Sequence, residues 1–355
     1  MILGGVMELN DVLRHAVDIG ASDVHFAVGG PVNIRVNGVL IPYNEHVLTQ
    51  DETAAIAKHI IPTDLYSTFE KDGQLDTAYR ITDHSVFRVN VFKYSGKIGI
   101  AARCISDVIP SIAELGLPET VEKIAGYSSG LIIVTGPTGC GKSTTIAAII
   151  DAINKSKKRH ILTIEDPIEY IHRNKNCMIT QREVGRDCNN FSEALRAGLR
   201  QDPDVIMVGE MRDLETISIA VTAAETGHLV LATLHTRNSY QTIERIIDVF
   251  PSTHQQQIRV QLSNSLMAVF SQRLLPKKDG TGRVPAVESM FVTPAVRNLI
   301  RENKVHQLYT FIQTGQKTGM QTMDDHLISL YRKRIIDRET LLENAYDRDV
   351  VMKEL

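Results

Sequence analysis

Hydrophobic and polar positions follow both helical and strand patterns over the first hundred residues. Apolar residues recur at helical spacing over positions 9–17, and a second helical pattern covers 51–61. Two short apolar runs flank Asn37-Gly38, a pair of residues that is typical of a two-residue hairpin turn. These patterns predict that residues 1–106 form a small α+β domain.

A second hairpin is predicted further along this domain. Apolar and polar residues alternate over 87–91, and a return strand is expected over 98–105, across the turn at 94–96. Pairing that is symmetric about this turn would place Arg88 directly opposite Arg103. Because like charges in that position destabilise a sheet, two arginines on one face predict contact with an anionic partner. Two arginines splayed into solvent are the alternative.

After this domain the pattern changes to strands that alternate with helices. Two prolines and one glycine within 107–118 indicate a linker, so the second domain is expected over 119–355. Its apolar strands are expected at 131–135, 161–164, 205–208 and 229–234, with helices such as 143–154 and 191–200 between them. Such alternation indicates an α/β fold with a parallel sheet that is covered on both faces. From about Ala286 onward the pattern is helical.

Composition and charge narrow the class of protein. The chain has 355 residues, of which 43% are hydrophobic and 23% charged, so it can bury sizeable cores. Its 39 basic and 42 acidic residues give a net charge of -3, which argues against a surface that is built mainly for nucleic acid. The N-terminus carries no basic leader, and no apolar run reaches the roughly 18 residues of a membrane span.

The cysteines suggest neither zinc nor disulfides. The chain has four of them, and no two are spaced as C-x-x-C. Four reduced thiols in a cytosolic protein are expected.

A phosphate-binding loop is the most specific motif in the chain. Residues 136–143 read Gly-Pro-Thr-Gly-Cys-Gly-Lys-Ser, follow an apolar strand and open a helix, as G-x-x-x-x-G-K-[ST] requires. Lys142 would neutralise the β- and γ-phosphates, and the Ser143 hydroxyl would bind Mg²⁺. The nucleotide-binding residues are expected to be Gly136, Pro137, Thr138, Gly139, Cys140, Gly141, Lys142, Ser143 and Thr144.

Two acidic residues follow predicted strands and are candidates for catalysis. In open parallel sheets, ligands bind beyond the carboxyl ends of the strands, where Glu165 and Glu210 are expected. Glu210 is the candidate that activates water, and Glu165 is the candidate that supports Mg²⁺ through water. A helix-capping role is the alternative for each. His228 and His235 bracket one strand, so only one of them is expected to reach the phosphates.

These motifs resemble those of a known family, the secretion ATPases of type II and type IV pilus systems, and in particular its pilus retraction members. The matching segments are 136–144, the Asp box 161–170, 181–185, the atypical Walker B segment 202–213, the His box 226–235, and outside these 21–25, 87–90 and 295–301. One departure is Arg237, in a position where the family usually has Asn.

The resemblance implies a fold and a set of residue roles. The N-terminal domain would be PAS-like, the C-terminal domain a RecA-like P-loop ATPase, and the assembly a homohexameric ring that binds ATP and Mg²⁺. Glu210 would be the catalytic glutamate and Glu165 would assist at the metal. His228 would sense the γ-phosphate, while Arg88 and Arg103 would approach the nucleotide of a neighbouring subunit.

The implied function is a motor that couples ATP hydrolysis to pilus retraction. It would act at the cytoplasmic face of the inner membrane on a platform protein, indirectly on the pilin machinery, and would touch the membrane only through partners. The alternatives are an extension or type II secretion ATPase, an accessory retraction paralogue, and a RecA-like DNA translocase. The lack of C-x-x-C and the start directly in the PAS-like domain favour retraction. The acidic balance disfavours nucleic acid, and the intact Lys142, Ser143, Glu165 and Glu210 disfavour a non-catalytic scaffold.

Overall fold

The chain folds into two compact units, Met1–Val108 and Ile109–Leu355, each with its own hydrophobic core. The computed structural model describes residues 2–3, 7–36, 38–82, 85–105 and 108–355. Asn37 of the predicted turn, residue 106 at the end of the predicted first domain and residue 107 at the start of the predicted linker lie outside the described residues.

The first unit is built on a six-stranded antiparallel sheet in the order β5-β4-β3-β8-β7-β6. Its strands are β3 (Asp23–Phe26), β4 (Asn33–Val36), β5 (Val39–Pro42), β6 (Gln74–Thr82), β7 (Ser85–Tyr94) and β8 (Lys97–Ile105). Its helices are α1 (Leu9–Asp18), α2 (Gln50–Ile60) and α3 (Tyr66–Asp72), and two short strands, β1 (Ile2–Leu3) and β2 (Met7–Glu8), precede them.

Local sequence signals account for these elements, and the α+β prediction is confirmed. Helix α1 turns four apolar side chains into the core, at the spacing seen in the sequence. Helix α2 begins at a capping box, in which the Thr49 hydroxyl accepts from the Glu52 amide and the Glu52 carboxylate accepts from the Thr49 amide. The two predicted hairpins are β4-β5 and β7-β8.

The second unit contains a seven-stranded sheet in the order β11-β10-β12-β13-β9-β14-β15, parallel except for the last pair. Its strands are β9 (Gly130–Thr135), β10 (His160–Glu165), β11 (Met178–Glu183), β12 (Val205–Val208), β13 (Leu229–Leu234), β14 (Leu266–Pro276) and β15 (Arg283–Phe291). All residues of β9, β12 and β13 are buried, so the sheet is covered on both faces as predicted.

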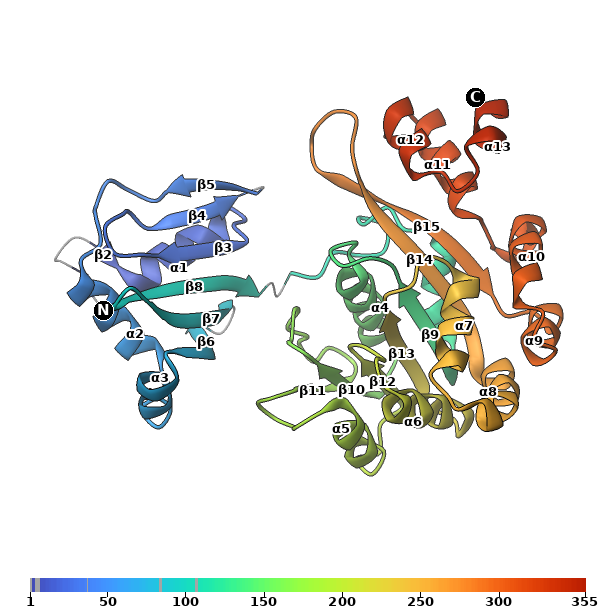
Figure 1. Cartoon of the computed structure of the whole chain (residues 1–355), viewed down its shortest axis with the longest axis horizontal. Helices are drawn as coiled ribbons and strands as arrows, with labels where there is room; N and C mark the ends of the chain where they lie inside the picture. Colours follow the sequence, from blue (N-terminus) through green and yellow to red (C-terminus); the bar gives the residue numbers. More distant parts are fainter. Residues whose placement is uncertain (1, 4–6, 37, 83–84, 106–107) are drawn as a thin grey trace. The chain divides into compact units, whose positions relative to one another are not determined.

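Helices connect and cover these strands (Figure 1). They are α4 (Lys142–Ser156), α5 (Phe191–Gly198), α6 (Leu214–Glu225), α7 (Ser239–Asp248), α8 (Ser252–Ser265), α9 (Pro294–Arg301), α10 (Leu308–Thr314), α11 (Met323–Arg332), α12 (Arg338–Asn344) and α13 (Arg348–Lys353). The 3₁₀ turns are η1 (Glu119–Gly126), η2 (Val305–Gln307) and η3 (Gln316–Thr318). Helix α11 packs on β15, and α11 and α12 share a separate small core with the β14-β15 hairpin.

The predicted start of the helical C-terminal part, at about Ala286, is wrong. Ala286 lies inside β15, which pairs antiparallel with β14, and the first helix after it begins at Pro294. Residues 284–291 are all buried, so the segment lacks the alternation that marks a half-buried strand. A continuous apolar run of this kind does not distinguish a buried strand from a buried helix.

Part of the predicted linker belongs to the second unit. Ile112 and Leu117 are buried in its hydrophobic core. Within the described part of the chain, no helix combines the length and the apolar character that crossing a bilayer would need.

Candidate functional site

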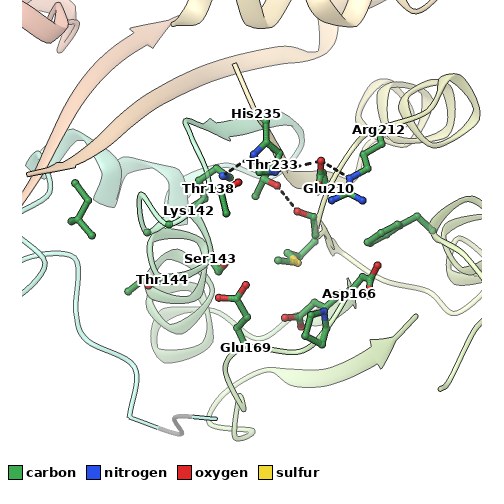
Figure 2. Close-up of a pocket in the computed structure, with 18 of the residues that line it drawn as sticks. Thr138, Lys142, Ser143, Thr144, Asp166, Glu169, Glu210, Arg212, Thr233 and His235 are labelled. Carbon is green, nitrogen blue, oxygen red and sulfur yellow. Dashed lines mark hydrogen bonds and ion pairs between the residues drawn. The ribbon is translucent and has the colours of Figure 1, made fainter. Parts of the chain in front are cut away.

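A cavity of about 390 Å³ lies at the carboxyl edge of the parallel sheet (Figure 2). The phosphate-loop turn between β9 and α4, the ends of β10, β12 and β13, and the β14-β15 hairpin contribute to its wall. It is lined by Thr138, Gly139, Gly141, Lys142, Ser143, Thr144, Glu165, Asp166, Pro167, Glu169, Phe191, Met207, Gly209, Glu210, Arg212, Thr233, His235, Leu274 and Arg283. Most of the predicted site residues of the second unit therefore share one cavity.

The phosphate loop has the backbone shape that its glycines predict. Gly139 and Gly141 have φ values of +77° and +87°, in the region that residues with a Cβ rarely adopt. Helix α4 starts directly after Gly141, so its first amides point into the cavity wall. Pro137 and Cys140 do not line the cavity with their side chains, and the Cys140 side chain is buried. The loop therefore presents backbone donors to an anion.

Lys142 is buried in the loop and is held by carbonyl groups. Its Nζ donates to the carbonyl oxygens of Gly136, at 2.9 Å, and Pro137, at 3.1 Å, and lies 3.5 Å from Nδ1 of His235. Burial lowers the pKa of Lys142, because the charged form is poorly solvated there. A phosphate in the cavity would supply the negative charge that these neutral acceptors lack.

Gln272 of β14 braces the loop, and the sequence analysis did not identify it. Its Nε2 donates to the Cys140 carbonyl oxygen at 2.7 Å, and its Oε1 accepts from the Thr145 hydroxyl at 3.0 Å. Its carbonyl oxygen lies only 2.3 Å from the position that a Cβ on Gly136 would take, so no side chain fits there. Gln272 lies within β14, a strand that the sequence analysis did not assign, so no signal connected it to the loop.

Glu165 ends β10 and is almost completely buried. The Thr163 hydroxyl donates to its Oε1 at 2.6 Å, and Gln181 Nε2 donates to the same oxygen at 3.1 Å. Burial raises the pKa of Glu165 in spite of these hydrogen bonds, and the nearby charge of Glu169 acts in the same direction. A cation next to Glu165 would favour its charged form.

Glu210 follows β12 and lies between two basic side chains (Figure 2). Its Oε1 is 2.7 Å from Nε of Arg212 and 3.4 Å from Nε2 of His235. Burial alone would raise the pKa of Glu210, but the hydrogen bond from Arg212 and the charges of His235 and Arg212 hold it below its usual value. The carboxylate is therefore ionised and positioned. Thr233 of β13 donates to the Gly209 carbonyl, which ties the preceding backbone to the sheet.

The histidine that reaches this cavity is His235 and not His228. His228 precedes β13, its Nδ1 lies 3.0 Å from the Ala223 carbonyl oxygen, and it does not line the cavity. Since strands run from one edge of the sheet to the other, residues at the two ends of β13 lie at opposite edges. The prediction that His228 senses a γ-phosphate is corrected on this ground.

Four charged cavity residues were not among the predicted site residues. They are Asp166, Glu169, Arg212 and Arg283. Asp166 and Glu169 lie within the Asp box segment that the sequence analysis quoted, so a signal for them was present. Arg283 begins β15, and because the sequence analysis expected a helical pattern there, it did not place Arg283 beside the cavity.

The register of the first unit confirms the predicted arginine pair. Arg88 of β7 is directly opposite Arg103 of β8. Arg103 Nε lies 2.9 Å from Asp23, and Arg88 Nε lies 3.9 Å from Asp76. These two aspartates, with Asn90 and Ala101, line a hollow of about 180 Å³ around the arginines. In the isolated chain, carboxylates on the same sheet therefore offset the like-charge repulsion.

Comparison with known proteins places the chain in a family. A family model described as type II/IV secretion system protein matches residues 6–315. The chain belongs to this family. The match includes the whole cavity at the phosphate loop, because β9 to β15 all lie inside the matched residues.

Relatives in this family resemble the chain over nearly its whole length. It is 47% identical, over 96% of its residues, to the type IV pilus retractation ATPase PilT of Pseudomonas aeruginosa, and covers 98% of that protein. It is 41% identical over 96% of its residues to the type IV pilus ATPase PilU of the same organism, and covers 89% of that protein. A crystal structure of the pilus retraction motor PilT with bound ADP matches 98% of this chain and 99% of that one, with 43% identity and a TM-score of 0.90. These matches confirm the predicted fold class and the resemblance.

The Gln272 brace generates a prediction within this family fold. Gln272→Met keeps the side-chain length but leaves the Cys140 carbonyl and the Thr145 hydroxyl without their buried partner. Each such loss costs about 1–3 kcal/mol, so we expect nucleotide affinity to fall about tenfold or more in a titration with a fluorescent ATP analogue. Gln321→Met is the matched control, because Gln321 also donates to a backbone carbonyl but lies outside the cavity. Equal losses in both variants would contradict the specific role of Gln272.

Proposed function

We propose that this protein is an ATPase motor that couples ATP hydrolysis to the retraction of type IV pili. The observation that carries the proposal is the cavity in which Lys142, Ser143, Glu165 and Glu210 meet at the phosphate loop. The 47% identity to PilT, over almost all of both chains, supports the same activity and the same biological role.

The cavity has the groups that a nucleoside triphosphate needs. The amides of the phosphate loop and the start of α4 would bind phosphate oxygens, and Lys142 would exchange its carbonyl partners for the β- and γ-phosphates. Gly139 and Gly141 let the loop curve around the phosphates, because both have positive φ values that residues with a Cβ rarely adopt. Thr144 also lines this cavity, and its hydroxyl lies 2.9 Å from the Tyr170 hydroxyl.

Ser143 and Glu165 fit a magnesium ion that is shared with the nucleotide. Among the residues that the structure describes, no group of three or more His, Cys, Asp or Glu side chains is arranged to hold a metal by itself. Mg²⁺ is commonly bound by one or two protein oxygens together with substrate phosphates, which suits a hydroxyl and one carboxylate. When bound, it would neutralise charge that develops on the phosphates. Because burial raises the pKa of Glu165, a proton would compete with the ion as the pH falls.

Glu210 is suited to orient the attacking water. Its pKa is held low by Arg212 and His235, so it is ionised but a weak base. An ionised acceptor at the cavity wall can align a water molecule for in-line attack, and phosphoryl transfer asks mainly for such positioning. His235 lies between Lys142 and Glu210, so we assign to it the γ-phosphate contact that the resemblance gave to His228.

The arginine pair would complete the site of another subunit. Arg88 and Arg103 are 41% and 71% exposed at their side chains, and their ion pairs with Asp76 and Asp23 are at the surface. Exposed pairs of this kind contribute about 0–1 kcal/mol, so a phosphate group could replace the aspartates at little cost. This arrangement supports a homohexameric ring in which the first unit of one protomer meets the nucleotide of its neighbour.

The wider assignment extends the proposed retraction function to the place and the partners of the motor. The motor would work at the cytoplasmic face of the inner membrane, on a platform protein and through it on the pilin machinery, with no nucleic-acid substrate. An accessory retraction role is the second candidate, because the identity to PilU is 41% over the same share of the chain.

A first prediction concerns the role of Glu210. Glu210→Gln keeps the shape of the side chain but removes the charge that aligns water. We expect ATP binding to stay within about twofold, while steady-state phosphate release falls at least about a hundredfold. Glu225→Gln, at an exposed position on α6, is the control, because it removes one negative charge outside the cavity. Hydrolysis near the normal rate in Glu210→Gln would remove Glu210 from this role.

A second prediction concerns the arginine pair. The double variant Arg88→Ala, Arg103→Ala should lower turnover of the assembled protein by about a thousandfold, the contribution typical of an arginine finger. Its unfolding free energy should change by no more than about 1 kcal/mol, because only exposed ion pairs are lost. Arg14→Ala with Lys58→Ala removes two exposed cations from helices of the same unit and should leave turnover unchanged. Unchanged turnover in the arginine variant would leave the pair as surface charge.

The biological role is tested by a count of surface pili in a strain that lacks the gene. Loss of a retraction motor should increase the number of pili and abolish twitching, since assembly continues without withdrawal. Loss of an extension motor would leave no pili. Loss of an accessory paralogue would leave retraction by the main motor in place, so twitching would persist. Only the first outcome agrees with the main proposal.

A further inference from the structure

A second cavity in the second unit has a chemistry that the nucleotide site does not use. It has a volume of about 240 Å³ and lies between the start of α7, strand β15, helix α10 and the turn before α13. It is lined by Asn238, Tyr240, Glu288, Tyr309, Ile312, Tyr346 and Asp347. None of these residues lines the cavity at the phosphate loop.

Glu288 is a buried carboxylate in the wall of this cavity. It is only 1% exposed, and its Oε1 accepts from the amide of Ser239 at 2.8 Å and from the Ser239 hydroxyl at 2.7 Å. Both of these hydrogen bonds reach the same oxygen. Burial raises the pKa of Glu288 in spite of them, and Arg273 offsets only part of that effect. A buried carboxylate is stabilised most effectively by a cation beside it.

Other acidic groups make the potential around the cavity negative. Asp324 of α11 is buried and accepts from the amides of Tyr346, at 2.8 Å, and Asp347, at 3.0 Å. Burial, together with the charges of Asp324, Asp325, Glu288 and Asp347, raises the pKa of Tyr309 to about 12. None of the described residues that line this cavity is basic, but Arg273 lies 4.9 Å from the centre of the Tyr346 ring and donates to the Asn344 carbonyl oxygen.

Three tyrosines complete the wall. Tyr240, Tyr309 and Tyr346 come from α7, α10 and the turn before α13, so the rings approach the cavity from separate elements. Aromatic faces and carboxylates together suit an ammonium group, which is attracted by ring electrons and by negative charge. An anion would be repelled by the carboxylates, and a neutral ligand would add no positive charge to the partial compensation that Arg273 gives Glu288.

We propose that this cavity binds a primary alkylammonium group, with Glu288 as its charge partner and the three tyrosines as its apolar wall. The group can belong to a diffusible polyamine or to a lysine side chain of another protein, and the chemistry of recognition is the same. The site adjoins the segment between β13 and α7 that contains His235, because the Tyr346 hydroxyl donates to the Arg237 carbonyl at 2.5 Å and Asn238 caps α7.

The test uses n-butylammonium as the probe and the full-length chain, at constant ionic strength and pH, in an NMR saturation-transfer titration. We expect saturable binding of one probe per chain, and at least tenfold weaker binding of 1-butanol, which has the same chain but no charge. Equal binding of the two probes, or a signal that does not saturate, would overturn the proposal.

Glu288→Gln is the decisive variant, because an amide oxygen can still accept from Ser239 while the charge is removed. We expect it to weaken probe binding at least tenfold, and unchanged affinity would refute the assignment.

If that variant does not fold, Asp347→Asn replaces it, since asparagine can keep the cap of α13. Its matched control is Asp337→Asn, which caps α12 outside the cavity. Asp347→Asn should weaken binding about threefold or more, and equal effects of the two changes would count against the proposal.

Two further probes identify the source of the ammonium group. Putrescine and Nα-acetyl-lysine amide should each displace n-butylammonium. Tighter binding of putrescine would identify a polyamine, and tighter binding of the lysine derivative would identify a side chain of another protein. Failure of both to compete would overturn the proposal.

Discussion

The contact between the phosphate loop and β14 is the constraint on which the site depends. Gly136 packs against the backbone of Gln272 so closely that a Cβ would have no room, and the Gln272 side chain bonds both to the loop and to α4. The loop is therefore shaped from behind by a neighbouring strand, and its amides are left for the ligand. Binding of a phosphate then requires little loss of conformational entropy in the loop, since the groups that bind it are already arranged.

The charged side chains in the cavity have partners within the protein, but these partners compensate their charges only in part. Lys142 rests on neutral carbonyls, Glu165 is buried under hydrogen-bond donors, and Glu210 is paired with Arg212 and His235. Burial lowers the pKa of Lys142 and raises that of Glu165, so both groups would be more stable as ions beside opposite charge. A phosphate chain with a divalent cation supplies both charges at once, which explains why a single ligand suits the whole cavity.

The sequence predicted the parts of this protein that rest on local rules. The phosphate loop, the carboxyl-edge acids and the face-to-face pair of Arg88 and Arg103 all follow from short motifs or from symmetric pairing about a turn. It did not predict β15, because a strand that is buried on both faces has no alternation, and it therefore missed Arg283. Gln272 and Asp23 come from strands that are distant in sequence from the groups they contact, and Asp76 comes from β6, which the sequence analysis did not assign. Only the register of the sheets reveals these three residues.

The basic groups differ in how they can serve a motor. Lys142 is buried in the loop and held by carbonyl groups of its own unit, so its contribution to affinity does not depend on the arrangement of the units. Arg88 and Arg103 are exposed and held by ion pairs that contribute about 0–1 kcal/mol, so they can leave their aspartates at little cost. A ligand shifts a conformational equilibrium only by its difference in affinity between two states. Arginines that reach the phosphates in one arrangement of units and not in another would supply that difference, whereas Lys142 would not.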